Sequence, residues 1–104
     1  MNEKELQLYQ EAMEKWGIKL QIGVLAEECV ELAKPCLKMV RQLEAFGYYK
    51  DEVHKSLLEE VADVQIMINQ LMYGYLSPKD VEAVEAIKQA KLARVRLWLD
   101  ELEE

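Results

Sequence analysis

Residues 25–32, LAEECVEL, and residues 57–64, LLEEVADV, carry the same order of residue types: apolar, apolar, Glu, Glu, apolar, apolar, acid, apolar. In an α-helix, residues three apart lie on the same side, so each copy presents an acidic pair. The four acids at these positions are Glu28, Glu31, Glu60 and Asp63. Carboxylates that converge repel one another unless a cation lies between them. The repeat therefore predicts a helical hairpin with a metal site.

The chain is predicted to be all-α, because apolar residues recur at intervals of three and four and not of two. Four antiparallel helices are expected, over about Glu3–Trp16, Ile18–Ala45, Asp51–Tyr73 and Pro78–Leu102. Gly17, Gly47 and Gly74 follow the first three, where glycine takes the left-handed cap conformation without steric cost. Ser77 as N-cap and Pro78 at the first helical position start the last helix.

Two residues inside the second predicted helix, Gly23 and Pro35, are poor helix formers. Gly23 costs roughly 1 kcal/mol relative to alanine, so it is either tolerated or marks a close approach of another group. Pro35 removes a backbone hydrogen bond, which predicts a kink beyond the first acidic pair or a bend of the helix around the bundle.

Size and composition indicate a single domain over residues 1–104. No apolar run approaches the ~20 residues that cross a bilayer, and Met1–Glu5 does not resemble a signal peptide. Cys29 and Cys36 lie on one predicted helix and cannot easily pair, which favours a cytoplasmic protein. The net charge of −7 argues against binding to a nucleic-acid polymer, but a metal ion can join acidic protein to the phosphates of a nucleotide.

The acidic pairs are expected beside the apolar stripes of the two central helices. These stripes comprise Ile18, Ile22, Leu25, Cys29, Leu32, Cys36 and Leu43 on one helix, and Leu57, Val61, Val64, Ile68 and Leu71 on the other. Carboxylate oxygens on rigid helices suit Mg²⁺, with Mn²⁺ as an alternative. Glu27 and Glu59 are expected further round their helices from the apolar stripes, on the side towards solvent. The competing interpretation is an ordinary solvated acidic face.

A di-iron site, the other acidic site of helical bundles, requires Glu-x-x-His on two helices. Glu31 and Asp63 occupy the positions where histidine is needed, and the single histidine, His54, lies away from both pairs. The pattern therefore argues against a di-iron site.

The last helix carries cations that are candidates for a phosphate clamp. Lys88 falls within its apolar stripe, Lys91 lies beside the stripe, and Arg94 follows on the same flank. A lysine whose stem packs while its ammonium reaches water gives the same pattern. Lys38 and Arg41 are weaker candidates.

The acidic motif, Glu-Glu-x-x-Glu followed after 28 residues by Glu-x-x-Asp, resembles that of the MazG-like all-α nucleoside triphosphate pyrophosphatases. The matching residues are Glu27, Glu28, Glu31, Glu60 and Asp63. Trp16-Gly17-x-x-x-Gln21 and Lys91-x-x-Arg94 are also similar to that family, and the resemblance covers about residues 10 to 100. Trp16 is a candidate for stacking on the base.

The resemblance implies a hydrolase that converts a nucleoside triphosphate to monophosphate and pyrophosphate, with Mg²⁺ held by the four acids. It also implies oligomers that share helices. Two alternatives stay open, a metal or nucleotide sensor without catalysis and a purely structural helical oligomer.

Self-association is also expected from the residues themselves, because the two central helices carry apolar side chains on a second face. These are Ala26, Val30, Ala33 and Leu37 on one helix, and Leu58, Ala62, Ile66 and Met67 on the other. A homodimer or a dimer of dimers would cover them.

Overall fold

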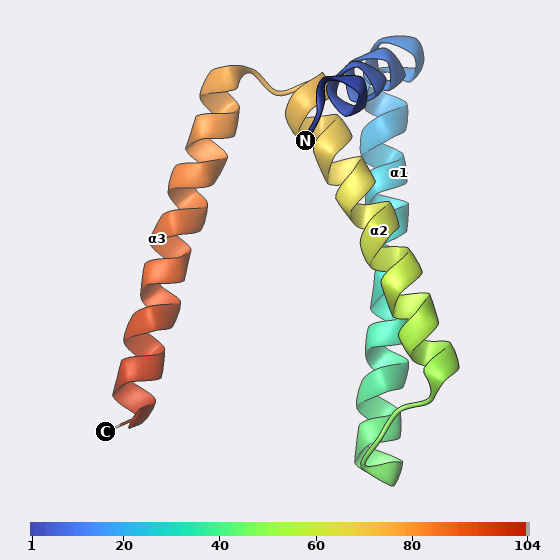
Figure 1. Ribbon diagram of the computed structural model, residues 1–104, viewed down its shortest axis with the longest axis vertical. Coiled ribbons are helices and arrows are strands. Elements are labelled where there is room, and N and C mark those ends of the chain that lie inside the picture. The colour runs from blue at the N-terminus through green and yellow to red at the C-terminus, as the bar shows by residue number, and fades with distance from the viewer. Residues whose placement is uncertain (104) are drawn as a thin grey trace.

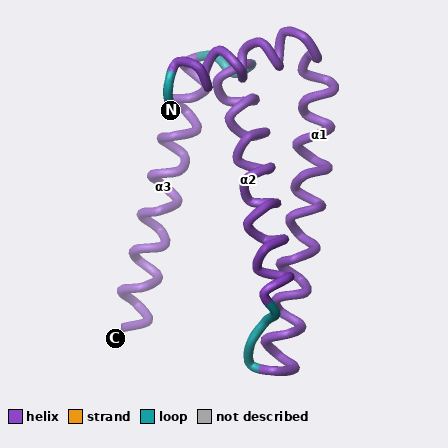
Figure 2. The backbone as a smooth tube through the Cα atoms, turned by 45° about the vertical axis from the view of Figure 1, so that its right-hand side comes forward, coloured by secondary structure: helices purple, strands orange, loops and turns teal. Residues whose placement is uncertain are grey.

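The computed structural model describes residues 1–103 and consists of three helices, with no strand among those residues. They are α1 (Glu3–Phe46), α2 (Asp51–Gly74) and α3 (Pro78–Glu103). The long part of α1 and α2 form an antiparallel hairpin, while the first turns of α1 cross one end of it (Figure 1). The same arrangement is visible after rotation in Figure 2. No helix within residues 1–103 is both long enough and apolar enough to cross a membrane.

The all-α class is confirmed, with three helices in place of the predicted four because α1 includes a kink at Gly17. The backbone of Gly17 has φ 80° and ψ 162°, which is not helical, and helical geometry resumes at the next residue. The segments predicted as Glu3–Trp16 and Ile18–Ala45 are therefore two helical segments joined by this kink. Pro35 lies in α1 without a second break, since Gly17 is the only non-helical residue inside α1.

The helix ends show which local signals were correctly interpreted. Gly47 adopts the left-handed conformation, and its N–H donates to the carbonyl of Leu43 at 2.9 Å. Ser77 and Asp80 form a reciprocal capping box, because the Asp80 N–H donates to Ser77 Oγ at 3.1 Å and the Ser77 N–H donates to Asp80 Oδ2 at 3.3 Å.

Gly74 ends α2 as predicted, but for a different reason. It does not have a positive φ. A Cβ at this position would lie 2.7 Å from the carbonyl oxygen of Tyr9 and 2.9 Å from Cβ of Met13. Gly74 is required because the N-terminal part of α1 crosses there. At Gly23, by contrast, an added Cβ would meet nothing within 4 Å.

The hairpin is held by a heptad-like seam in which buried or half-buried residues alternate at intervals of four and three. On α1 these positions are Gln21, Leu25, Glu28, Leu32, Pro35, Met39 and Gln42, and on α2 they are Val53, Leu57, Glu60, Val64, Met67, Leu71 and Gly74. At one end, Gln70 Nε2 donates to Gln21 Oε1 at 2.7 Å between two buried amides.

The seam differs from the apolar stripes predicted from sequence. Ile22, Cys29 and Cys36 are exposed on α1, and Val61 and Ile68 are exposed on α2. Leu25 and Leu32 on α1, and Leu57, Val64 and Leu71 on α2, belong to both sets. The seam on α1 is rotated towards the acids, so that Glu28 lies within it and not on its flank.

Little apolar surface is covered within one chain. The buried apolar residues are Tyr9, Ala12, Met13, Val53, Val64 and Met67. The second faces predicted from sequence stay largely exposed, and Val30 and Leu37 each expose 60% of their surface. Met67 was wrongly assigned to that face, because it is buried in the seam. Helix α3 does not pack along the hairpin (Figure 1), and residues 82–102 are all exposed. The Cα radius of gyration is 17.4 Å, whereas a compact chain of this length is expected near 13 Å.

Candidate metal centre

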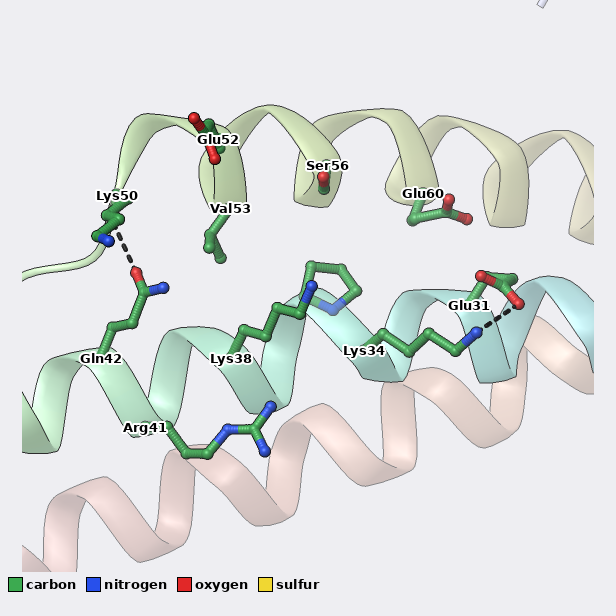
Figure 3. A pocket seen from close by; sticks show the side chains of 11 residues that line it. Glu31, Lys34, Lys38, Arg41, Gln42, Lys50, Glu52, Val53, Ser56 and Glu60 are labelled. Atoms are coloured by element: carbon green, nitrogen blue, oxygen red, sulfur yellow. Dashed lines mark hydrogen bonds and ion pairs between the residues drawn. The ribbon is translucent and has the colours of Figure 1, made fainter.

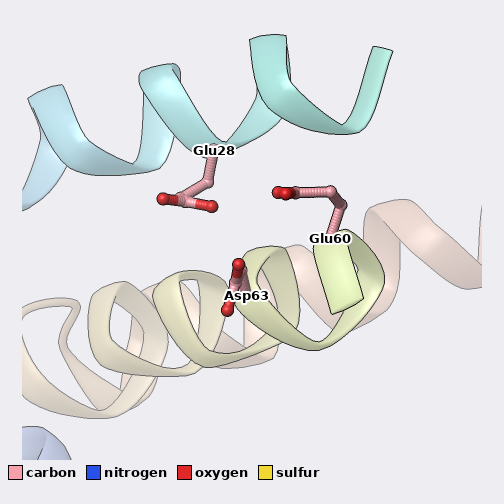
Figure 4. Close-up of side chains that lie close together, drawn as sticks. All are labelled: Glu28, Glu60 and Asp63. Atoms are coloured by element: carbon pink, nitrogen blue, oxygen red, sulfur yellow. The ribbon is translucent and has the colours of Figure 1, made fainter. Parts of the chain in front are cut away.

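Three of the four predicted acids converge midway along the hairpin. Glu28 of α1 and Glu60 and Asp63 of α2 each offer a carboxylate oxygen, and these oxygens all lie within 4.8 Å of one another. Figure 4 shows Glu28 facing the two acids of α2 across the space between the helices. Because Glu28 and Glu60 occupy seam positions, their side chains are directed towards the opposite helix by the heptad spacing itself.

The electrostatics of the cluster are unfavourable for three free carboxylates. Partial burial raises the pKa of Glu28, and the nearby negative charges of Asp63 and then Glu60 raise the same pKa further. Oε2 of Glu60 is buried and has no hydrogen-bond partner. A buried oxygen without a donor costs free energy, and either a proton shared with Glu28 or a bound cation would supply the missing partner.

This donor set fits a divalent cation with a preference for oxygen. Mg²⁺ commonly binds through a few carboxylates and keeps several waters for substrate phosphates. The unpartnered Glu60 oxygen is the observation that supports such an ion. Among residues 1–103, the ion pairs are Lys34 with Glu31 and Arg96 with Asp100, so none neutralises Glu28, Glu60 or Asp63.

Glu31 lies outside the cluster. Its Oε1 accepts from Lys34 Nζ at 3.0 Å on the exposed side of α1. Glu31 and Glu60 nevertheless both line a groove between α1 and α2. An exposed ion pair of this kind contributes only about 0–1 kcal/mol, so a stronger cation can compete with Lys34 for Glu31.

The remaining predicted ligands are spread over the chain. Lys88, Lys91 and Arg94 are exposed on α3, apart from the hairpin. Trp16 is exposed just before the bend, with Lys15 Nζ 5.8 Å from its ring centroid. The side chain of Gln21 is buried at the end of the seam and bonded to Gln70.

Two basic residues that line the groove were not identified from the sequence. Lys34 and Lys50 line the groove together with Lys38 and Arg41, which had been weaker candidates. The sequence indicated part of this basic cluster, because Lys34, Lys38 and Arg41 share one face of a helix. Nothing local indicated that Lys50 would join them from the loop.

Comparisons of this chain with protein-family models, curated proteins and solved structures find no match. Interpretation of the site therefore depends on its own chemistry.

Proposed function

We propose that this protein is a divalent-metal-dependent hydrolase that cleaves a nucleoside triphosphate to the monophosphate and pyrophosphate. The observation that supports the proposal most strongly is the position of Glu28 and Glu60 in the seam between two helices, with Asp63 alongside. Glu28 and Glu60 are half-buried and Asp63 is exposed, and carboxylates that face one another at a helix contact repel. Their repulsion opposes folding of the metal-free protein, so a functional ion is the simplest physical reason for them.

Glu28, Glu60 and Asp63 would hold the ion, and Glu31 would join them after leaving Lys34. When bound, Mg²⁺ or Mn²⁺ would neutralise phosphate oxygens and lower the pKa of a water that attacks the α-phosphorus. The chain's own contribution is positional. The carboxylates are fixed on two packed helices, and phosphoryl transfer depends mainly on positioning and electrostatic stabilisation.

The resemblance of the duplicated acidic motif to the MazG-like pyrophosphatases supports the same assignment. It provides the cleavage point between the α- and β-phosphates, which the carboxylates alone do not specify. The exposed ring of Trp16 is available to stack on a base. We also propose a cytoplasmic location, because both cysteines are free and exposed.

We further propose a homodimer or a dimer of dimers. Large apolar side chains are exposed on α1, α2 and α3, among them Val30, Leu37 and Leu97, each 60% exposed, and exposed apolar patches often mark an interface. Packing of α3 on a second copy would cover them. It would also give Lys88, Lys91 and Arg94 a route to the acidic cluster of that copy.

A second candidate is a purely structural helical oligomer, and the exposure of α3 favours it. In that case the acids are solvated and have no role in catalysis. A pyrophosphate-release assay over a panel of ribo- and deoxyribonucleoside triphosphates, with Mg²⁺ and with chelator, separates the two. Metal-dependent release that is lost in Glu60→Gln and kept in Glu59→Gln supports the hydrolase, and no release with any nucleotide contradicts it.

A further inference from the structure

A groove of about 620 Å³ lies between the C-terminal half of α1 and the N-terminal half of α2 (Figure 3). Glu60 lines this groove and also belongs to the acidic cluster with Glu28 and Asp63. The groove therefore begins at the candidate metal centre and leads from it towards the loop of the hairpin. Its volume is in the range typical of small-molecule sites, about 300–1,000 Å³.

The charge of the groove is opposite to that of the chain. Its walls include four cations, Lys34, Lys38, Arg41 and Lys50, and three acids, Glu31, Glu52 and Glu60, so four minus three gives a net charge of +1. The whole chain has a net charge of −7. Gathering cations at one place on an acidic protein concentrates anions there.

Most of these cations have no acidic partner. Lys34 pairs with Glu31 at 3.0 Å, but Lys38, Arg41 and Lys50 form no ion pair with any described residue of the chain. In Figure 3, Lys38 extends from α1 towards α2, whereas Lys34 lies along α1 towards Glu31. The groove thus contains charged hydrogen-bond donors that remain free for a ligand.

The start of α2 adds to the same potential. Lys50 is the N-cap of this 24-residue helix and makes no side-chain cap hydrogen bond. Lys50, Glu52 and Val53 line the groove, so the positive end of the helix dipole is directed near it. Asp51 and Glu52 in the first turn offset part of this effect.

We propose that this groove binds the two terminal phosphates of the substrate, that is, the pyrophosphate leaving group. The inference rests on the proposed function, since it takes the acidic cluster as the place where the α-phosphate meets the metal. A triphosphate chain that starts there extends along the groove to Lys38 and Arg41. Arg41 offers five N–H donors in a planar fork suited to phosphate. The cations come from within one chain, so this subsite does not depend on α3.

The test is calorimetric binding of inorganic tripolyphosphate and orthophosphate, with Mg²⁺ present, to the full chain. Lys38→Gln/Arg41→Gln is compared with Lys55→Gln/Lys79→Gln, which removes the same two charges at exposed positions outside the groove. We expect the groove variant to bind tripolyphosphate at least about tenfold more weakly and the control to bind as the wild type does. Orthophosphate affinity changes less, because one phosphate reaches only part of the groove.

The proposal is overturned if the groove variant binds tripolyphosphate with wild-type affinity, if both variants weaken equally, or if the wild-type chain does not bind it. The Mg²⁺-dependent rise in melting temperature, measured without phosphate, is a separate readout of the acidic cluster. If that rise is normal while binding is insensitive to Lys38 and Arg41, the groove assignment fails and the proposed function survives. If the rise is absent while binding still depends on Lys38 and Arg41, the proposed metal chemistry fails and the anion site stands.

Discussion

Glu28 and Glu60 face each other across the α1–α2 seam, where the positions one heptad away are Gln21 and Pro35 on α1 and Val53 and Met67 on α2. Replacing apolar contacts by opposed carboxylates sacrifices packing free energy and adds repulsion. The pair is therefore a place where folding of the metal-free chain and binding of a cation are in direct competition.

Metal binding is expected to stabilise the protein. An ion that binds only the folded state, at a hundred times its Kd, adds about 2.7 kcal/mol, which raises the melting temperature of a chain of this size by roughly 10 °C. Glu60→Gln and Asp63→Asn are expected to abolish this rise with Mg²⁺ or Mn²⁺ while keeping the helical content. Differential scanning fluorimetry with metal and with chelator measures the effect.

Glu59→Gln and Glu27→Gln are matched controls, because each removes one negative charge from an exposed neighbour of a cluster acid. They should keep the metal response. A rise of the same size in Glu28→Gln, Glu31→Gln, Glu60→Gln and Asp63→Asn would mean that the ion binds elsewhere.

The contribution of Glu28 to the stability of the metal-free protein should fall as pH rises. The folded chain raises the pKa of Glu28 above its ordinary value of 4.5, so the unfolded state loses this proton first. The contribution of Glu28 to the free energy of unfolding is then highest below the ordinary pKa and decreases through the window up to the raised pKa. Glu28→Gln removes this loss and should be more stable than the wild type at pH 7 in chelator, but not at pH 4.

With Mg²⁺ the sign reverses, because the ion requires ionised carboxylates and binds more tightly as pH rises. Urea denaturation at the two pH values, with metal and with chelator, measures both trends. Equal stability of Glu28→Gln and wild type at pH 7 in chelator would show that the repulsion is relieved by solvent.

The products should be nucleoside monophosphate and pyrophosphate. This follows if the ion at Glu28, Glu60 and Asp63 acts at the α-phosphate and the terminal phosphates leave together. Separation of the nucleotide products by ion-exchange chromatography distinguishes this cleavage from release of orthophosphate. Nucleoside diphosphate as the primary product would place the attack at the γ-phosphate and contradict the assignment.

Assembly should depend on the apolar stripe of α3, which comprises Val81, Val84, Leu92, Val95, Leu99 and Leu102. Val95 lies on this stripe and is 43% exposed within one chain. Val95→Glu is expected to weaken self-association at least about tenfold, because a charge at a desolvated interface costs free energy. Ala93→Glu places the same charge on the opposite side of α3 and should have little effect.

Light scattering at micromolar concentration gives the assembly state. The wild type is expected at a multiple of 12.1 kDa. A 12.1 kDa monomer that hydrolyses substrate would show that one chain is sufficient.

Two glycine substitutions should have opposite effects on stability. Gly74→Ala places a Cβ 2.7 Å from the Tyr9 carbonyl oxygen, so the backbone must move, at a cost of about 1–3 kcal/mol. Gly23→Ala meets no atom within 4 Å and should gain about 0.5–1 kcal/mol by restricting the unfolded chain. Thermal unfolding of both variants measures the difference. Equal shifts in melting temperature would show that the N-terminal part of α1 does not pack closely on Gly74.

Local signals allowed most helix boundaries to be predicted. The Ser77–Asp80 capping box and the left-handed Gly47 are fixed by neighbours in sequence. Gly17 marked a real change of direction, but a positive φ at one residue does not reveal whether the helix resumes. The role of Gly74 depends on Tyr9, which is distant in sequence, so it was not visible locally.

The site was predicted in part for a related reason. Both central helices are apolar on two sides, so the sequence does not specify which side faces the hairpin partner and which is left for another copy. In the structure, the side of α1 that faces α2 carries Glu28, so Glu28 lies in the seam, whereas Glu31 forms an ion pair with Lys34. Cations on α3 could be identified as a cluster, but their distance from the acids depends on how α3 packs.

The bend at Gly17 has a consequence for the choice of ion. It lays Tyr9, Ala12 and Met13 over the end of the hairpin, so half of the buried apolar residues hold α1 and α2 together at that end. Towards the loop the seam continues through buried Pro35 and Val53, and the Lys50 N–H donates to Gln42 Oε1 at 2.8 Å. The bent end is therefore one of two places that fix the separation of the helices, and with it the distance between the carboxylates of Glu28 and Glu60. Mg²⁺ requires oxygens at 2.0–2.1 Å and Ca²⁺ at 2.3–2.6 Å, so discrimination between them depends on how firmly the bent end holds. Gly17→Ala, which strains that bend without replacing a proposed metal ligand, should narrow the difference between the Mg²⁺ and Ca²⁺ affinities measured by titration.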